Sequence, residues 1–294
     1  MAGQKKIIFV NSFKGGSGKT TLSLTHCIDS LFHTKKYDNV IYLDLDILGT
    51  ATSYLFEEGK LPNEGSFDKT GELKGVELKS GDDVNKLHVG YLSPEMKNSS
   101  KYGEPCFIHH QKLAEELFIK RVIDFIEKQI KEAPSCLIVL DCAPGFGEIE
   151  QKVLNNCYQK TSKGDVQIEE DYLVTLDAAH VKKCIQCLNY YSKDVDFDGE
   201  KRQIQMVIND VQNFCGHLKE EGEDEMQVME GIMEKVNSET ANLKMSFRLW
   251  KYSQKIAVNS VYTMRTNVEN QVDDYMFTPE NYIEWKEGCG FAYN

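Results

Sequence analysis

Short apolar runs recur along the chain and are separated by longer stretches with helical periodicity. The runs rich in β-branched and aromatic residues are predicted as strands at 6–12, 39–45, 87–92, 136–141, 171–176 and 203–209. Several of them are almost continuously apolar, which is typical of strands covered on both faces. The pattern therefore predicts a sheet buried between two layers.

Helices are predicted in the intervals. The clearest spans 112–130, followed by Pro134 as a stop. Its apolar side chains lie largely along one side: Leu113, Leu117, Ile123, Phe125, Ile126 and Ile130. Alternating strands and helices predict an α/β fold with a single doubly wound, mostly parallel sheet flanked by helices.

The domain organisation follows from length and composition. A chain of 294 residues suits one large α/β domain, and we expect a single domain over 1–294. Residues near 57–85 are rich in glycine and charge, and are interpreted as an irregular insertion.

The net charge and the cysteine content restrict the class of protein to which the chain could belong. The net charge of −12 excludes a basic field over the whole surface for binding nucleic acid. No stretch approaches the ~20 apolar residues of a membrane span, and the N-terminus does not resemble a signal peptide. The nine cysteines follow no regular spacing, so we expect mostly reduced thiols in a cytoplasmic protein.

A glycine-rich loop, GGSGKT at 15–20, joins the first predicted strand to a helix that begins near Thr21. Glycines let backbone N–H groups turn toward a phosphate, and the helix N-terminus adds positive potential. A lysine and a threonine at the end of such a loop contact the β- and γ-phosphates and Mg²⁺. The residues predicted to bind the nucleotide here are Gly15, Gly16, Ser17, Gly18, Lys19, Thr20 and Thr21.

The loop departs from the general P-loop pattern, which has a glycine where this chain has Phe13. Residues 14–20, KGGSGKT, instead resemble the deviant Walker A motif of the ParA/MinD family of dimerising ATPases. The resemblance implies a P-loop fold, ATP and Mg²⁺ as ligands, and a homodimer that sandwiches nucleotide. In that dimer Lys14 would contact the phosphates bound by the partner, while Lys19 serves its own.

Two acidic segments extend the resemblance. Asp44 and Asp46, in YLDLDILGTATSYLF (42–56), point to the same side of a strand. The family implies that Asp46 positions the attacking water and Asp44 supports the Mg²⁺ shell. The ParA branch often has Pro-Gln where this chain has Ile47-Leu48.

The second segment is CLIVLDCAPGFG (136–147), in which Asp141 follows four apolar residues like a Walker B aspartate that holds Mg²⁺ through water. By resemblance, the N–H of Gly145 senses the γ-phosphate and Asn209 contacts adenine. The likeness is strong over 5–55 and 136–147, and residues 210–294 form a divergent C-terminal part. Residues 279–294 lack the basic amphipathic helix of MinD-like proteins, so the chain is closer to ParA-like members and no membrane contact is expected.

A basic window lies at 244–265 and contains no acidic residue. Its basic residues are Lys244, Arg248, Lys251, Lys255 and Arg265, with aromatic residues between them. Such a surface can hold DNA without sequence specificity, as ParA-type proteins do. The alternative interpretation is a core strand and a solvated connection, with Trp250 packed inside.

A second group that allows two interpretations consists of His180, Cys184 and Cys187, which share one face of a predicted helix. Buried thiols that pack a helix are one interpretation, and a metal or cluster site is the other.

The leading hypothesis is a ParA/MinD-like ATPase that dimerises on ATP and hydrolyses it slowly as a switch for positioning or partitioning DNA or another cargo. An activating partner protein fits this scheme. One alternative is a nucleotide-dependent binding switch with little turnover. The other is a metal- or cluster-carrier ATPase of the same superfamily.

Overall fold

The computed structural model describes residues 3–46, 73–80, 83–90, 105–145, 147–160, 166–193, 202–210, 217, 219–222, 224–240, 243 and 245–250. The predicted Ile47-Leu48 loop, and Lys244, Lys251, Lys255 and Arg265 of the basic window, lie outside these residues.

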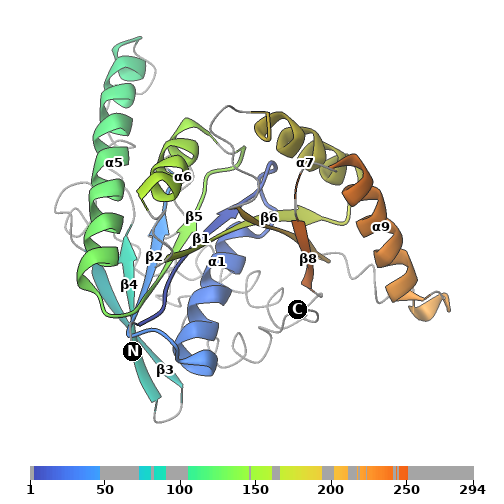
Figure 1. Ribbon diagram of the computed structural model, residues 1–294, viewed down its shortest axis with the longest axis horizontal. Coiled ribbons are helices and arrows are strands. Elements are labelled where there is room, and N and C mark those ends of the chain that lie inside the picture. Colours follow the sequence, from blue (N-terminus) through green and yellow to red (C-terminus); the bar gives the residue numbers. More distant parts are fainter. Residues whose placement is uncertain are drawn as a thin grey trace, which may run out of the picture.

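The described strands form one sheet of eight, in the order β3-β4-β2-β5-β1-β6-β7-β8 (Figure 1). Every pairing is parallel except that between β3 and β4, which is antiparallel. The strands are β1 (Lys5–Asn11), β2 (Asn39–Asp44), β3 (Lys74–Ser80), β4 (Asp83–Gly90), β5 (Cys136–Asp141), β6 (Val166–Thr175), β7 (Gln203–Asn209) and β8 (Met245–Trp250). The predicted mostly parallel sheet is confirmed.

Helices cover both faces of the sheet (Figure 1). They are α1 (Lys19–Ile28), its π-helical continuation η1 (Asp29–Thr34), α5 (Pro105–Glu132), α6 (Glu148–Lys160), α7 (Ala178–Tyr191) and α9 (Glu225–Glu239). The period of two along β1 divides the core: Ile7 and Phe9 pack with α5, α6 and α7, whereas Ile8 and Val10 pack with α1. Among the helices of the described residues, none is both long and apolar enough to cross a bilayer.

The prediction of an irregular insertion near 57–85 is wrong for its last part. Lys74–Ser80 is a regular edge strand, β3, and β4 begins at Asp83. Leu78 of β3 is buried while Gly75 and Glu77 are exposed, an alternation that suits an antiparallel edge strand. Residues 57–72 and 81–82 lie outside the described residues.

A buried ion pair joins β6 to the residue before β7. The Arg202 guanidinium donates two hydrogen bonds of 2.5 Å to the Glu170 carboxylate, whose side chain is fully buried. The guanidinium also lies over the rings of Tyr158 and Tyr191, with its carbon 5.0 and 4.5 Å from their centroids. The pair therefore ties β6 to neighbours on the α6–α7 side of the sheet.

We expect Arg202→Ala to lower the free energy of unfolding by about 3–5 kcal/mol, because it leaves the Glu170 carboxylate buried without its cation. Urea unfolding monitored by circular dichroism measures this loss. Arg121→Ala, at an exposed position on α5, is the matched control and should change stability by less than about 0.5 kcal/mol. A loss for Arg202→Ala no larger than that of the control would contradict the structural role of the pair.

Candidate nucleotide-binding site

The glycine loop turns from β1 into α1 at the carboxyl edge of the sheet. Gly18 has a left-handed backbone (φ 97°) and its carbonyl accepts the first helical hydrogen bond, from Leu22 N at 2.9 Å. A Cβ at Gly18 would lie 2.9 Å from Asn209 Nδ2, so both the backbone angle and the close approach require glycine. Gly15 and Gly16 face open space, as a loop that receives a ligand should.

Residues of β6 and β7 make two contacts that hold the loop in place. Asn209, at the end of β7, donates a 2.9 Å hydrogen bond from Nδ2 to the carbonyl of Ser17. Phe13 stands where the general P-loop motif has its first glycine, and it stacks on Tyr172 with ring centroids 5.7 Å apart. Its side chain is therefore part of the core. Asn209 therefore lies at the site, supporting the loop, and its predicted contact with adenine stays a prediction.

Asp141 ends β5 directly beside the start of α1. It pairs in register with Asp44 on one side and Val10 on the other. Its Oδ2 accepts a 2.8 Å hydrogen bond from the Tyr42 hydroxyl, and its buried Oδ1 has no hydrogen-bond partner among the described residues. Burial raises the pKa of this carboxyl, against the opposing effects of the Thr20 and Tyr42 hydroxyls and the Lys19 ammonium. A divalent cation would stabilise the charged carboxylate, so Asp141 and Thr20 fit the predicted Mg²⁺ site.

Asp44 and Asp46 stand at the end of β2, next to Asp141. Asp44 is buried and its Oδ1 accepts a 2.9 Å hydrogen bond from the backbone N of Asp46, which fixes the turn after the strand. Asp46 is half-buried and its charge contributes to raising the pKa of both Asp141 and Glu150. The predicted acidic residues are thus brought together at one edge of the sheet.

Glu150 is a site residue that the sequence analysis missed. It is buried near the start of α6, and its Oε1 accepts a 2.9 Å hydrogen bond from the backbone N of Ala143. Burial raises its pKa, while the N–H groups of Ala143 and Gly147 favour the charged form. A glutamate three residues after the helix cap indicates a contact with the N–H of Gly147, but not the bond to Ala143. Glu150 thereby fixes the loop that follows the Walker B-like strand.

Lys14 lies at the start of the loop and is exposed, whereas Lys19 lies at its end and is half-buried. Its side chain is 53% exposed, and its Nζ bonds Asp177 Oδ2 at 2.9 Å. Asp177 is also the N-cap of α7, where its Oδ1 accepts from the backbone N of Ala179 and His180. The Lys14 ammonium is the main cause of a lowered pKa at Asp177. Lys14 is therefore held within its own chain at the exposed rim of the site.

His180 supports the same end of the loop. The backbone N of Thr175 donates to His180 Nδ1 at 3.1 Å, so the proton of the neutral ring lies on Nε2. Nε2 lies 3.4 Å from Ser12 Oγ, which also accepts from the backbone N of Lys14 at 3.3 Å. Burial lowers the pKa of His180 and favours this neutral form. His180 is thus a positioning residue for the start of the loop.

Gly145 follows Asp141 at an exposed turn with φ 108°. Its N–H donates a 2.9 Å hydrogen bond to the carbonyl of Ser12. The predicted contact of this N–H with a γ-phosphate therefore requires that bond to be exchanged.

The metal-carrier alternative finds no support among the described cysteines, all of which are free. Cys184 is fully buried and both ring nitrogens of His180 have protein partners. No group of three His, Cys, Asp or Glu side chains in the described ranges could by itself hold a metal ion. A Mg²⁺ ion at Asp141 would accordingly need the Thr20 hydroxyl, phosphate oxygens and water as further ligands.

Only part of the predicted basic surface falls in the described residues. Arg248 lies half-buried on β8, and Trp250 is buried in the α1 side of the core. The interpretation of this start of the window as a core strand with Trp250 inside is confirmed, so Trp250 cannot stack on bases.

Comparisons with known proteins agree with the fold. Neither protein-family models nor curated protein sequences give a match. Among solved structures, a ParA family ATPase from Chlorobium tepidum TLS aligns over 96% of this chain and 99% of its own, with 11% identity and a TM-score of 0.52. The pnob8 ParA structure aligns over 82% of this chain and 74% of its own, with 12% identity and a TM-score of 0.52.

The sheet order, the loop from β1 to α1 and the acidic strand ends are those of the P-loop class of folds. Within that class the chain has the fold of the ParA/MinD-like ATPases, as its deviant Walker A motif predicts.

Proposed function

We propose that this protein is an ATPase that binds ATP with Mg²⁺, forms a nucleotide-sandwich homodimer, and hydrolyses ATP slowly as a switch. One observation carries the proposal: the loop presents its two lysines differently. Lys19 opens α1 half-buried, and its charge acts on Asp141, whereas Lys14 lies at the exposed rim, where it pairs with Asp177. A lysine at the rim can reach a second molecule, while one at the helix start serves its own nucleotide.

The chemistry assigned to the chain is mostly positioning and charge neutralisation. Lys19 and the loop N–H groups bind the phosphates, and Lys14 of a second copy adds positive charge from across the interface. Asp46 orients a water, whose oxygen bonds to the γ-phosphorus while the bond from that phosphorus to the β–γ bridging oxygen breaks. The proton of the water leaves with the phosphate or the solvent. Mg²⁺ held at Asp141 and Thr20, with Asp44 supporting its shell, would neutralise charge that develops on the leaving diphosphate.

Sizing the protein without nucleotide, with ADP and with ATP tests the proposal. We expect a dimer with ATP only, together with slow release of phosphate. A wild-type protein that stays monomeric in all three conditions would rule out the sandwich. ATP-dependent dimers without phosphate release would favour the nucleotide-dependent binding switch.

The contact between Lys14 and Asp177 leads to a separate prediction. Asp177→Asn keeps a good N-cap for α7 but removes the charge that holds Lys14. Because an exposed ion pair is weak, we expect the ATP concentration for half-maximal dimerisation to fall by no more than about fivefold. Analytical ultracentrifugation across an ATP titration measures this shift, with Asp224→Asn at an exposed site before α9 as the matched control. A higher ATP requirement in Asp177→Asn would mean that this carboxylate assists dimerisation.

DNA is the cargo that the resemblance favours, through Lys244, Arg248, Lys251, Lys255 and Arg265. Binding that needs ATP and weakens steeply with salt, without sequence preference, would support this part of the proposal. Equal affinity for DNA with and without ATP would speak against DNA as the switched cargo.

A further inference from the structure

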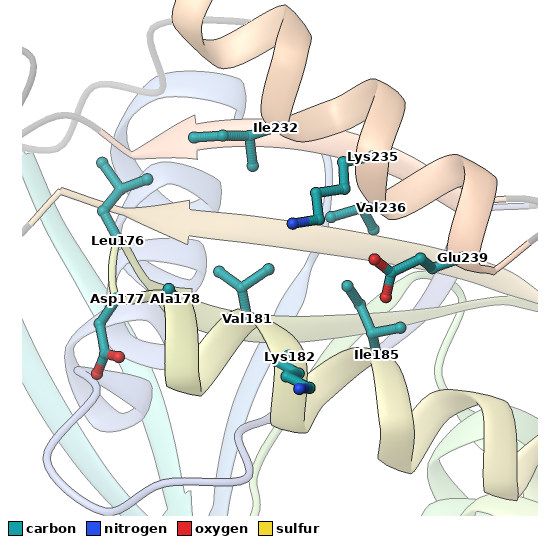
Figure 2. A pocket seen from close by; sticks show the side chains of 10 residues that line it. All are labelled: Leu176, Asp177, Ala178, Val181, Lys182, Ile185, Ile232, Lys235, Val236 and Glu239. Carbon is teal, nitrogen blue, oxygen red and sulfur yellow. The ribbon is translucent and has the colours of Figure 1, made fainter.

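A groove runs between α7 and α9 (Figure 2). It encloses about 420 Å³. Val181 and Ile185 from α7 point across it toward Ile232 and Val236 from α9. All four side chains are apolar, so the groove offers a surface that gains free energy when an apolar group leaves water to fill it.

A hydrogen bond joins the two helices at one end of the groove. Asn189 Nδ2 on α7 donates a 2.7 Å hydrogen bond to the carbonyl of Glu239 at the end of α9. At the other end the lining reaches Leu176 and Asp177, just before α7. One end of the groove therefore lies at this hydrogen bond, and the other end lies beside the rim of the nucleotide site.

The charged residues on the rim of the groove determine which kind of ligand it could bind. Lys182 on α7 and Lys235 on α9 line opposite walls, and neither forms an ion pair with any described residue. Glu239 lies at the hydrogen-bonded end, and Asp177 at the other is already neutralised by Lys14. In a chain with a net charge of −12, two lysines beside an apolar floor are a local site for carboxylates.

We propose that this groove is a docking site for an amphipathic, acidic segment of a partner protein. Apolar side chains of the segment would enter between Val181 and Ile232, and its carboxylates would meet Lys182 and Lys235. This is the helix-in-groove mode of recognition, in which apolar anchors give affinity and rim charges give specificity. The apolar floor does not suit a nucleic acid, because none of the described residues that line the groove is aromatic and could stack on a base.

Selection from a displayed library of random peptides of about 16 residues tests the proposal on the full chain without nucleotide. We expect the selected peptides to carry net negative charge and apolar residues at helical spacing. Their affinity should fall at least about tenfold for Val181→Asp and for the double variant Lys182→Glu/Lys235→Glu. Lys183→Glu makes one such charge reversal on α7 outside the groove, and should leave affinity within about twofold.

The controls make every outcome informative. Each variant is first compared with wild type by thermal unfolding, and the exposed lysine changes keep the test valid should Val181→Asp fail to fold. Basic selected peptides, or acidic ones that bind the lysine variants as tightly as wild type, would overturn the proposal. So would binding of dodecanoate at the groove in a protein that retains no peptide, since the site would then take small amphipathic carboxylates. Because nucleotide is absent throughout, failure here leaves the proposed ATPase function untouched.

Discussion

Lys14→Ala is expected to lower ATP turnover by about 10³-fold or more and to abolish the ATP-dependent dimer. The physical reason is that each active site would lack the cation supplied by the second copy, while its own loop and Lys19 remain intact. Binding of a fluorescent ATP analogue to the monomer should therefore stay within a few fold of wild type. Phosphate release, sizing and analogue binding measure the three quantities on the same preparation.

Lys36→Ala is the matched control for this prediction, because Lys36 is an exposed lysine just beyond the far end of η1. It should show wild-type turnover and dimerisation. If Lys14→Ala lost analogue binding as completely as it lost turnover, Lys14 would act within its own subunit.

Asp141→Asn is expected to reduce Mg²⁺-dependent turnover by about 10²–10³-fold while making the nucleotide-free protein more stable at neutral pH. The carboxylate is buried, and one of its oxygens has no hydrogen-bond partner in the part of the chain that the structure describes, so the folded chain bears a desolvation cost that an amide largely avoids. The stability gain should be about 1.4 kcal/mol for each unit by which the folded pKa exceeds the unfolded one. Urea unfolding and phosphate release measure the two opposite effects.

The same substitution should change how stability depends on pH. Burial raises the pKa of Asp141 above its ordinary value of 3.8, so its neutral form stabilises the fold fully below that pH. This contribution is lost as the pH rises through the higher folded pKa, and Asp141→Asn should lack the loss. Asp124→Asn, at an exposed position on α5, should reproduce the wild-type profile. Equal or lower neutral-pH stability in Asp141→Asn would show that this carboxylate is well solvated.

The central strands could be predicted because their apolar runs are nearly continuous. Cys136–Asp141 was predicted with its observed bounds, and so was Gln203–Asn209. β6 begins five residues before the prediction, because Glu169, Glu170 and Asp171 interrupt its apolar pattern. Each of these carboxylates has a side-chain partner that is distant in the sequence, so tertiary pairing overrides the local signal: the partners are Lys6, Arg202 and His26.

The site divides in the same way. Loop glycines, Lys19, Thr20 and the strand-end aspartates belong to short motifs, so their grouping could be predicted from the sequence. The partner of Lys14 could not be predicted, because Asp177 is 163 positions away in the sequence and its local sequence indicates only a helix N-cap. The same limit hid the groove between α7 and α9, which depends on how two helices with ordinary amphipathic patterns are placed.

A complementation experiment tests most directly whether the phosphates of one molecule are contacted by a lysine of another. Lys14→Ala and Asp46→Asn proteins, each inactive alone, are mixed in equal amounts with ATP. We expect turnover to rise above that of either protein alone, to as much as about a quarter of the wild-type value, because each mixed dimer keeps one Lys14 contact and one complete site, and random pairing would make about half of the dimers mixed. A mixture no more active than its two components would contradict the shared site and place Lys14 in its own subunit's chemistry.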